Sequence, residues 1–183
     1  MMVHRYNWKS TDENTRRRLL RRSQIDISDF VERIRPVVES VRNNGDQSLR
    51  EFTQRFDGVD LSSLPIAVQS PEFDAAEKDL PPTVRDALDY AIENVETYHR
   101  AQAVHGTEMV EVRPGLWAGE RAHPIDSAGL YVPRGRGSFP SMLYMLAVPA
   151  QLAGVVSVSV VSPPNSDGSV DAAVLYAARR CGI

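Results

Sequence analysis

The sequence has 183 residues and a formal net charge of −3, with 42% hydrophobic and 25% charged residues. This composition is typical of a globular protein, and its near-balanced charge excludes a general attraction to nucleic acid or to anionic membranes. Because Cys181 is the only cysteine, an internal disulfide and a cysteine-based zinc site are excluded too.

The first predicted helix begins at Ser10, which has capping-box spacing to Glu13. Five arginines follow between positions 16 and 22. A nucleic-acid-binding arm could carry them, but a solvated helix face is the favoured interpretation. The residues before this helix lack a long apolar core, and no run approaches the ~20 apolar residues that span a bilayer. We therefore expect no signal peptide, no membrane contact and a cytoplasmic location.

A second helix is predicted from apolar residues at helical spacing, namely Phe30, Ile34, Val37, Val38 and Val41. Pro36 interrupts this stretch, so the helix is expected to kink or restart there. Gly45 is a plausible stop and Asp46 a plausible N-cap for a third helix. That third helix is expected to bury Leu49, Phe52 and Phe56.

The stretch from residue 61 to 82 contains four prolines and is predicted to be irregular. Pro82 suits the first turn of a further helix. One side of that helix carries its apolar residues, Val84, Leu88, Ala91, Ile92 and Val95. The other side carries acidic residues that we expect to be solvated, Asp86, Asp89, Glu93 and Glu96.

A hairpin is predicted next, with strands at 109–113 and 116–121 around Pro114-Gly115. Residues 124–126 are expected to link two domains. The first, residues 1–126, is a helix-rich segment with a short hairpin. The second, residues 127–183, is the first β-α-β-α portion of a dinucleotide-binding domain, and we expect it to be truncated.

The second predicted domain alternates strands and helices. A strand at 128–132, a buried helix at 140–153, a Val-rich strand at 155–161 and a helix at 169–180 follow one another with short connections. Such an order implies a right-handed crossover and parallel pairing. The predicted fold class is therefore α/β: a helical N-terminal segment followed by the start of a Rossmann-like parallel-sheet domain, which is incomplete because two strands cannot bury both faces of a sheet.

A glycine-bearing loop joins the first of these strands to its helix. Gly135 and Gly137 would let the main chain approach a phosphate, while Arg134, Arg136 and Ser138 could contact an anion. The sequence is not the G-x-G-x-x-G fingerprint, because Pro140 occupies the third glycine position. A nucleotide-binding loop and a plain strand-to-helix turn with serine caps are both compatible with this spacing.

The same residues carry a family resemblance. The stretches that carry it are Gly129-Leu130-Tyr131-Val132-Pro133-Arg134-Gly135, Pro140-Ser141 and Met145 to Gly154, with ordered support from Asn44-Gly45-Asp46, Arg55 to Val59, Tyr98-His99, Pro124 to Asp126, Ser162-Pro163-Pro164 and Ala177 to Gly182. Together they resemble histidinol dehydrogenase over nearly the whole chain. One departure is the Arg134 to Gly137 segment, where that family more often has two glycines and a small residue.

The resemblance implies an enzyme that oxidises L-histidinol to L-histidine with NAD and zinc in histidine biosynthesis, acting as a homodimer. It implies that Tyr131 contacts NAD and that Pro133 helps to shape the same cleft. An aromatic ring with a hydroxyl at a strand end can stack on a dinucleotide or donate to it. For Tyr131 taken alone, an ordinary strand-end tyrosine would be the simpler interpretation.

The resemblance also places the zinc ligands and the Glu-His acid-base pair downstream of Ile183. We therefore predict no catalytic and no metal-binding residue in this chain. His99 and His105 stand six positions apart, which is not the spacing of a ligand pair on one helix face. Asp126 and Asp167 are expected to be turn or cap residues. Two alternatives stay open: a related zinc- and NAD-dependent alcohol dehydrogenase with another substrate, and a non-catalytic nucleotide-binding fragment.

Overall fold

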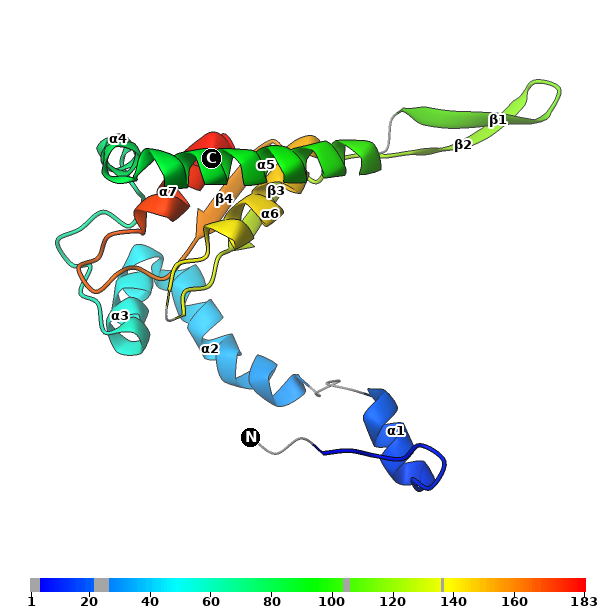
Figure 1. Ribbon diagram of the computed structural model, residues 1–183, viewed down its shortest axis with the longest axis horizontal. Coiled ribbons are helices and arrows are strands. Elements are labelled where there is room, and N and C mark those ends of the chain that lie inside the picture. The colour runs from blue at the N-terminus through cyan, green and yellow to red at the C-terminus, as the bar shows by residue number, and fades with distance from the viewer. Residues whose placement is uncertain (1–3, 22–26, 104–105, 136) are drawn as a thin grey trace. The chain divides into compact units, whose positions relative to one another are not determined.

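A computed structural model describes residues 4–21, 27–103, 106–135 and 137–183. The chain divides into two units, residues 1–48 and 49–183, and each is considered by itself. The predicted domain boundary near Asp126 lies inside the second unit and remains a prediction. Figure 1 labels the elements.

Helices make up the first unit: α1 (Glu13–Arg21), α2 (Ser28–Asn44) and the start of α3 (Asp46–Asp57). The cap of α1 is Asp12 and not Ser10, because Asp12 Oδ1 accepts the Thr15 amide at 2.9 Å. The helix does not restart at Pro36, which was one of the two expectations, since α2 continues through this residue. Gly45 ends α2 as predicted, with a φ of +56° that favours glycine.

The second unit holds the rest of α3 and all remaining elements. In chain order these are α4 (Ser70–Asp79), α5 (Pro82–Gln102), β1 (Thr107–Arg113), β2 (Leu116–Arg121), β3 (Ser127–Tyr131), α6 (Pro140–Leu152), β4 (Ser157–Val161) and α7 (Ala172–Arg180). Alternating strands and helices from β3 onward match the predicted order, so the α/β fold class is confirmed.

Helix α4 contradicts the prediction of an irregular segment between residues 61 and 82. Gln69 and Glu72 form a capping box at its start, and Pro71 occupies its first turn. In that position a proline lacks only an N–H that the helix would leave unpaired, so it favours the helix instead of breaking it. A proline therefore indicates an irregular segment only where it lies beyond the first turn of a helix.

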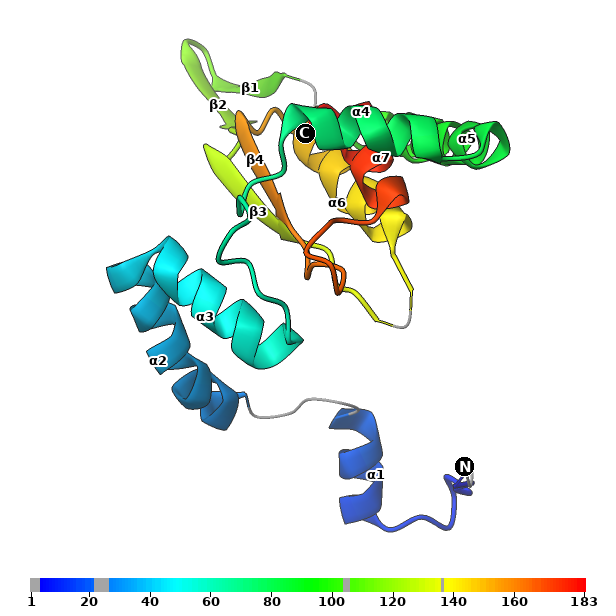
Figure 2. The ribbon, with the colours of Figure 1, turned by 90° about the vertical axis from the view of Figure 1, so that its left-hand side faces the viewer.

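Strands β3 and β4 pair in parallel, with Ser127 opposite Ser157 and Tyr131 opposite Val161. Along each strand exposed and half-buried residues alternate. Leu130 and Val160 pack against the core on one face, where helices α5, α6 and α7 lie (Figure 2). Tyr131 and Val161 belong to the other face of the pair.

The core forms where α5, α6 and α7 meet the covered face of these strands. Its buried members are Ile92, Val132, Leu143, Ala147, Val148, Val174, Ala177, Ala178 and Cys181. Leu143 and Ala147 are fully buried, whereas Met145 on the same helix is 56% exposed. Helix α6 is therefore covered on one side only, although its sequence is apolar nearly all round.

Polar contacts join α5 to α7. The Asp89 carboxylate accepts hydrogen bonds from the Tyr176 hydroxyl at 3.0 Å and from Arg180 Nε at 2.7 Å. Asp89 was expected to be solvated, and its side chain is 37% exposed, but it also bonds to a polar neighbour on another element that helix spacing does not reveal. The bonds place a carboxylate at the edge of the core without leaving it unpaired.

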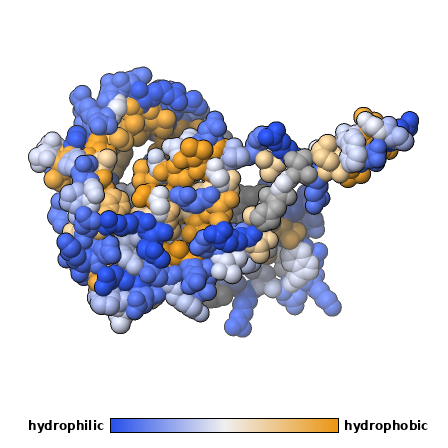
Figure 3. Space-filling view, turned by 90° about the horizontal axis from the view of Figure 1, so that it is seen from above, coloured by the Kyte–Doolittle hydropathy of each residue, from blue (hydrophilic) through white to orange (hydrophobic). Residues whose placement is uncertain are grey.

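The hairpin of β1 and β2 has the predicted turn, with Gly115 at a φ of +79°. Its large apolar side chains are exposed, including Met109, Val110, Val112, Leu116 and Trp117. Figure 3 shows this arm carrying both hydrophobic and hydrophilic residues. A two-stranded ribbon without a covered face is marginally stable in isolation.

Candidate functional site

The carboxyl ends of β3 and β4 form the candidate site. In open α/β sheets, ligands bind beyond the carboxyl ends of the parallel strands. Here the last residues of the two strands, Tyr131 and Val161, are partners in register. They are 59% and 57% exposed, so an aromatic ring and an aliphatic side chain stand next to each other on the uncovered face.

Tyr131 and Pro133 lie on either side of a buried residue. Val132 is fully buried between them, and its amide donates to the Val161 carbonyl at 2.9 Å. This bond continues the parallel ladder by one residue and fixes the end of β3. Among the described residues, the Tyr131 hydroxyl has no hydrogen-bond partner, so it is open to a ligand. Pro133 is half-buried and faces a different space.

That space is a cavity between the loop after β3 and the loop after β4. Pro133, Arg134, Ser138, Ser162 and Asp171 are among its lining residues. Its volume is about 10 Å³, which is about enough for one water molecule. The two loops are thus closed against each other at this cavity, while the exposed ring of Tyr131 lies on the uncovered face of the strands.

Two side-chain hydrogen bonds hold the loops together. Arg134 Nη1 donates to the Pro164 carbonyl at 2.8 Å, and the Ser138 hydroxyl donates to Asp171 Oδ1 at 2.8 Å. Ser138 therefore does not cap α6, although a serine cap was one of the two interpretations of the loop sequence. Asp171 was missed by sequence reasoning, although an aspartate directly before an apolar helix is a common N-cap.

The two loop carboxylates singled out in the sequence have local roles. Hydrogen bonds from the Ser169 hydroxyl and amide lower the pKa of Asp167, whose side chain is at the surface. The Asp126 carbonyl accepts the Ser157 amide beside the start of β4. Asp167 therefore acts as a turn residue, as predicted.

A metal centre is not formed by the residues that the structure describes. In that part of the chain, no three His, Cys, Asp or Glu side chains come together as a metal-binding group. His105 lies outside the described residues, and His99 contacts the Tyr98 ring. These residues therefore do not fit a zinc ion.

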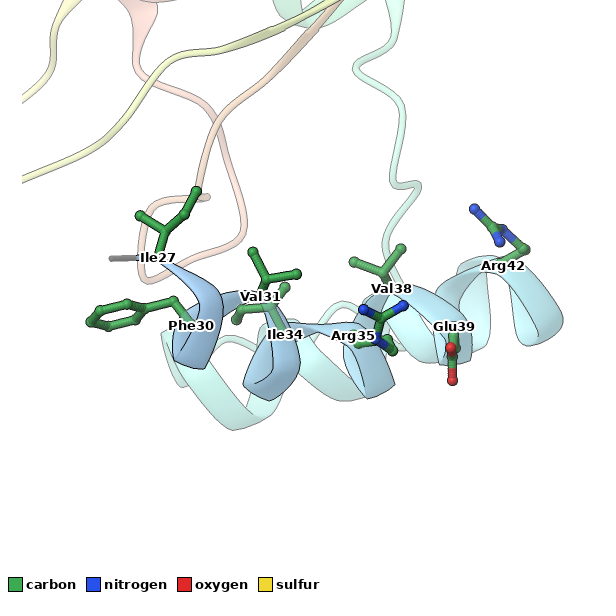
Figure 4. A pocket seen from close by; sticks show the side chains of 8 residues that line it. All are labelled: Ile27, Phe30, Val31, Ile34, Arg35, Val38, Glu39 and Arg42. Carbon is green, nitrogen blue, oxygen red and sulfur yellow. The ribbon is translucent and has the colours of Figure 1, made fainter. Parts of the chain in front are cut away.

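A further hollow lies elsewhere, along α2. It has a volume of about 470 Å³ and is lined by Ile27, Phe30, Val31, Ile34, Arg35, Val38, Glu39 and Arg42. Figure 4 shows these side chains projecting from a single helix. Most of its lining is the apolar side of an amphipathic helix, and we assign this hollow no part in the chemistry.

Comparisons with known proteins show which family the chain is similar to. A family model described as histidinol dehydrogenase matches residues 20–183. The chain is 43% identical over 178 residues to a "Histidinol dehydrogenase homolog" of Rhizobium meliloti, covering 97% of this chain and 39% of the relative. It is 42% identical over 164 residues to a histidinol dehydrogenase of Methanothermobacter thermautotrophicus, covering 90% of this chain and 38% of the relative.

A solved structure is similar as well. The crystal structure of histidinol dehydrogenase from Elizabethkingia anophelis aligns with a TM-score of 0.82 and 29% identity, over 94% of this chain and 39% of that one. The chain thus spans about two-fifths of the length of the relatives that it matches. No helix among the described residues is long and apolar enough to cross a membrane.

Proposed function

Because the chain belongs to the histidinol dehydrogenase family, we propose that it is the N-terminal, cofactor-contacting part of an oxidoreductase that converts L-histidinol to L-histidine with NAD. In this proposal NAD, when bound, accepts the hydride. The residues of this chain bind and orient it, while the proton transfers belong to residues beyond position 183.

The exposed ring of Tyr131 is the observation that carries the proposal. A ring that is 59% exposed at the carboxyl end of a parallel strand can stack on a flat heterocycle, and its hydroxyl can donate to a ribose or amide oxygen. Val161 extends the platform by one aliphatic side chain. Pro133 takes a supporting part, since its ring fixes the direction in which the chain leaves β3.

The remaining parts of the activity are assigned outside this chain. We propose that zinc is held by residues in the part of the family fold that these 183 residues do not span, together with the acid-base pair. We also propose a cytoplasmic homodimer for the complete enzyme. An assay of the 183-residue chain with histidinol, NAD and zinc is accordingly expected to give no turnover.

A second candidate keeps the enzyme class and changes the substrate. The Arg134 to Gly137 segment departs from the two glycines and a small residue that the family more often has, and this departure is compatible with an alcohol other than histidinol. Steady-state assays of the complete enzyme with histidinol and with acidic or neutral amino alcohols separate the two. A higher kcat/KM for histidinol supports the first candidate.

Binding of NADH to the 183-residue chain tests the proposed function directly. Ligand-observed NMR or NADH fluorescence should detect binding, and Tyr131→Ala should weaken it by about tenfold, in line with about 1–2 kcal/mol for an aromatic contact. Tyr131→Phe separates the ring from the hydroxyl. The control is Tyr90→Ala on α5, since Tyr90 is 69% exposed and remote in sequence from the site. Equal affinity in wild type and Tyr131→Ala would contradict the assignment.

A further inference from the structure

The loop after β3 is fastened to the start of α7 by a single carboxylate oxygen. For this purpose the glycine loop is defined as residues 133–135 and 137–139. Asp171 Oδ1 accepts the Ser138 hydroxyl at 2.8 Å, the Ala173 amide at 2.9 Å and the Val174 amide at 3.3 Å. One oxygen therefore caps α7 and holds the far end of the glycine loop at the same time.

This position suits a negatively charged acceptor. The first amides of a helix have no partner within the helix, and their partial positive charge stabilises a carboxylate at the N-cap. A hydroxyl that donates to an ionised carboxylate forms a stronger hydrogen bond than one between neutral groups. Both side chains are partly buried, so water competes less for the bond.

Among its described residues, the glycine loop makes few other hydrogen bonds that could hold its shape. Within it, the Gly135 amide donates to the Gly137 carbonyl at 3.3 Å, and glycines restrict the backbone least. Arg134 makes the second tie, to the Pro164 carbonyl. The near end of the loop is anchored by Val132, which is fully buried directly after Tyr131.

We propose that the Ser138–Asp171 hydrogen bond positions the glycine loop beside Tyr131 in the conformation that binds the nicotinamide cofactor. We name this hydrogen bond the clasp. The inference rests on the proposed function for its ligand. A loop that is already ordered loses less conformational entropy on binding than a free one, so the clasp increases cofactor affinity without touching the cofactor.

Four variants test the clasp while Asp171 stays in place as the cap of α7. Ser138→Ala removes the hydroxyl and leaves Asp171 to cap α7. Ser138→Thr keeps a hydroxyl and should restore the bond. Ser166→Ala is the matched control, because Ser166 is an exposed serine in the neighbouring loop. Arg134→Gln combined with Ser138→Ala removes both ties and should give the largest effect.

The first readout is hydrogen exchange of peptides that span residues 133–142, measured by mass spectrometry. The variants are compared with the wild type where their melting temperatures are the same. Ser138→Ala should speed the exchange of this segment, and Ser138→Thr should return it towards the wild-type rate. This result does not depend on any ligand. Unchanged exchange in Ser138→Ala and in the double variant would overturn the clasp.

The second readout is the NADH dissociation constant of the same variants. We expect Ser138→Ala to raise it about three- to tenfold, the range for the net loss of one hydrogen bond, and Ser166→Ala to leave it unchanged. Faster exchange with unchanged affinity would overturn the role in cofactor binding while leaving the clasp intact. Absence of NADH binding by the wild-type chain would instead overturn the proposed function, and the cofactor role with it.

Discussion

At the scale of single residues, Cys181 makes a prediction about pH. Burial raises the pKa of its thiol from an ordinary value of 9.0 to about 11. Between these values the unfolded chain releases the thiol proton before the folded chain does. The free energy of unfolding should therefore fall as pH rises from about 9 to about 11, by at most about 2–3 kcal/mol.

Urea unfolding of wild type and Cys181→Ala at several pH values from 8 to 11 measures this effect. Other groups that titrate in this range contribute to both proteins, so the difference between their slopes isolates the thiol. The slope should be shallower in Cys181→Ala. Parallel slopes would show that the folded and unfolded chains hold this proton equally well.

The sequence could predict the roles of residues whose conformation depends on their neighbours along the chain. Gly45 and Gly115 adopt the positive φ that suits their predicted positions at a helix end and in a hairpin turn. The partners of Asp89 and Asp171 were not predicted, since they lie 87 and 33 positions away along the chain. Sequence spacing describes a residue's own helix and contains no information about such distant partners.

At the scale of elements, α6 carries a matched pair of apolar positions. Leu143→Ala should lower the free energy of unfolding by about 2–5 kcal/mol, because it opens a cavity at a fully buried site. Met145→Ala, two residues later on the exposed side, should change it by less than about 0.5 kcal/mol. Chemical denaturation of both variants checks the contrast. Similar losses would mean that both sides of α6 are covered in solution.

Elements with strong local patterns were predicted well. The hairpin, the parallel strands and helices α5, α6 and α7 all appear within a few residues of their expected ranges. Burial was harder to predict: Leu49 and Phe56 were expected to be buried, yet they are 38% and 60% exposed. Helical spacing predicts which side of a helix is apolar, but whether another element covers that side depends on tertiary packing.

At the scale of the whole molecule, the candidate site depends on a topology that the sequence indicated. The order strand, helix, strand, helix predicted parallel pairing, and this pairing brings Tyr131 to the same edge as Val161. The sequence did not predict which loop residues tie that edge together, because hydrogen bonds such as Ser138 to Asp171 depend on loop conformation. The strand edge at which the candidate site is proposed could therefore be predicted, whereas the hydrogen bonds between its loops could not.

The distribution of buried residues between the two units predicts unequal stability. Every buried apolar residue of the described chain belongs to the second unit, whereas α2 has none. An isolated helix of this length is marginal in water, because packing of an apolar face provides most helical stability in proteins. The amides of α2 should therefore exchange at least about 100-fold faster than those of α7, whose residues 174–178 are buried.

We also expect a gradient of amide exchange rates within α2, which hydrogen exchange followed by mass spectrometry can measure. The one buried side chain of the first unit's described residues is Ser48, whose hydroxyl lies 2.8 Å from the hydroxyl of Ser40 and donates to the Ser40 carbonyl. This contact ties the C-terminal turns of α2 to the start of α3, so residues 38–44 should exchange more slowly than residues 28–34. Ser48→Ala should remove the difference, while Ser70→Ala at the start of α4 serves as a control. Protection of residues 28–34 equal to that of α7 would mean that the apolar stripe of α2 is covered in solution, and local unfolding would then not begin in this helix.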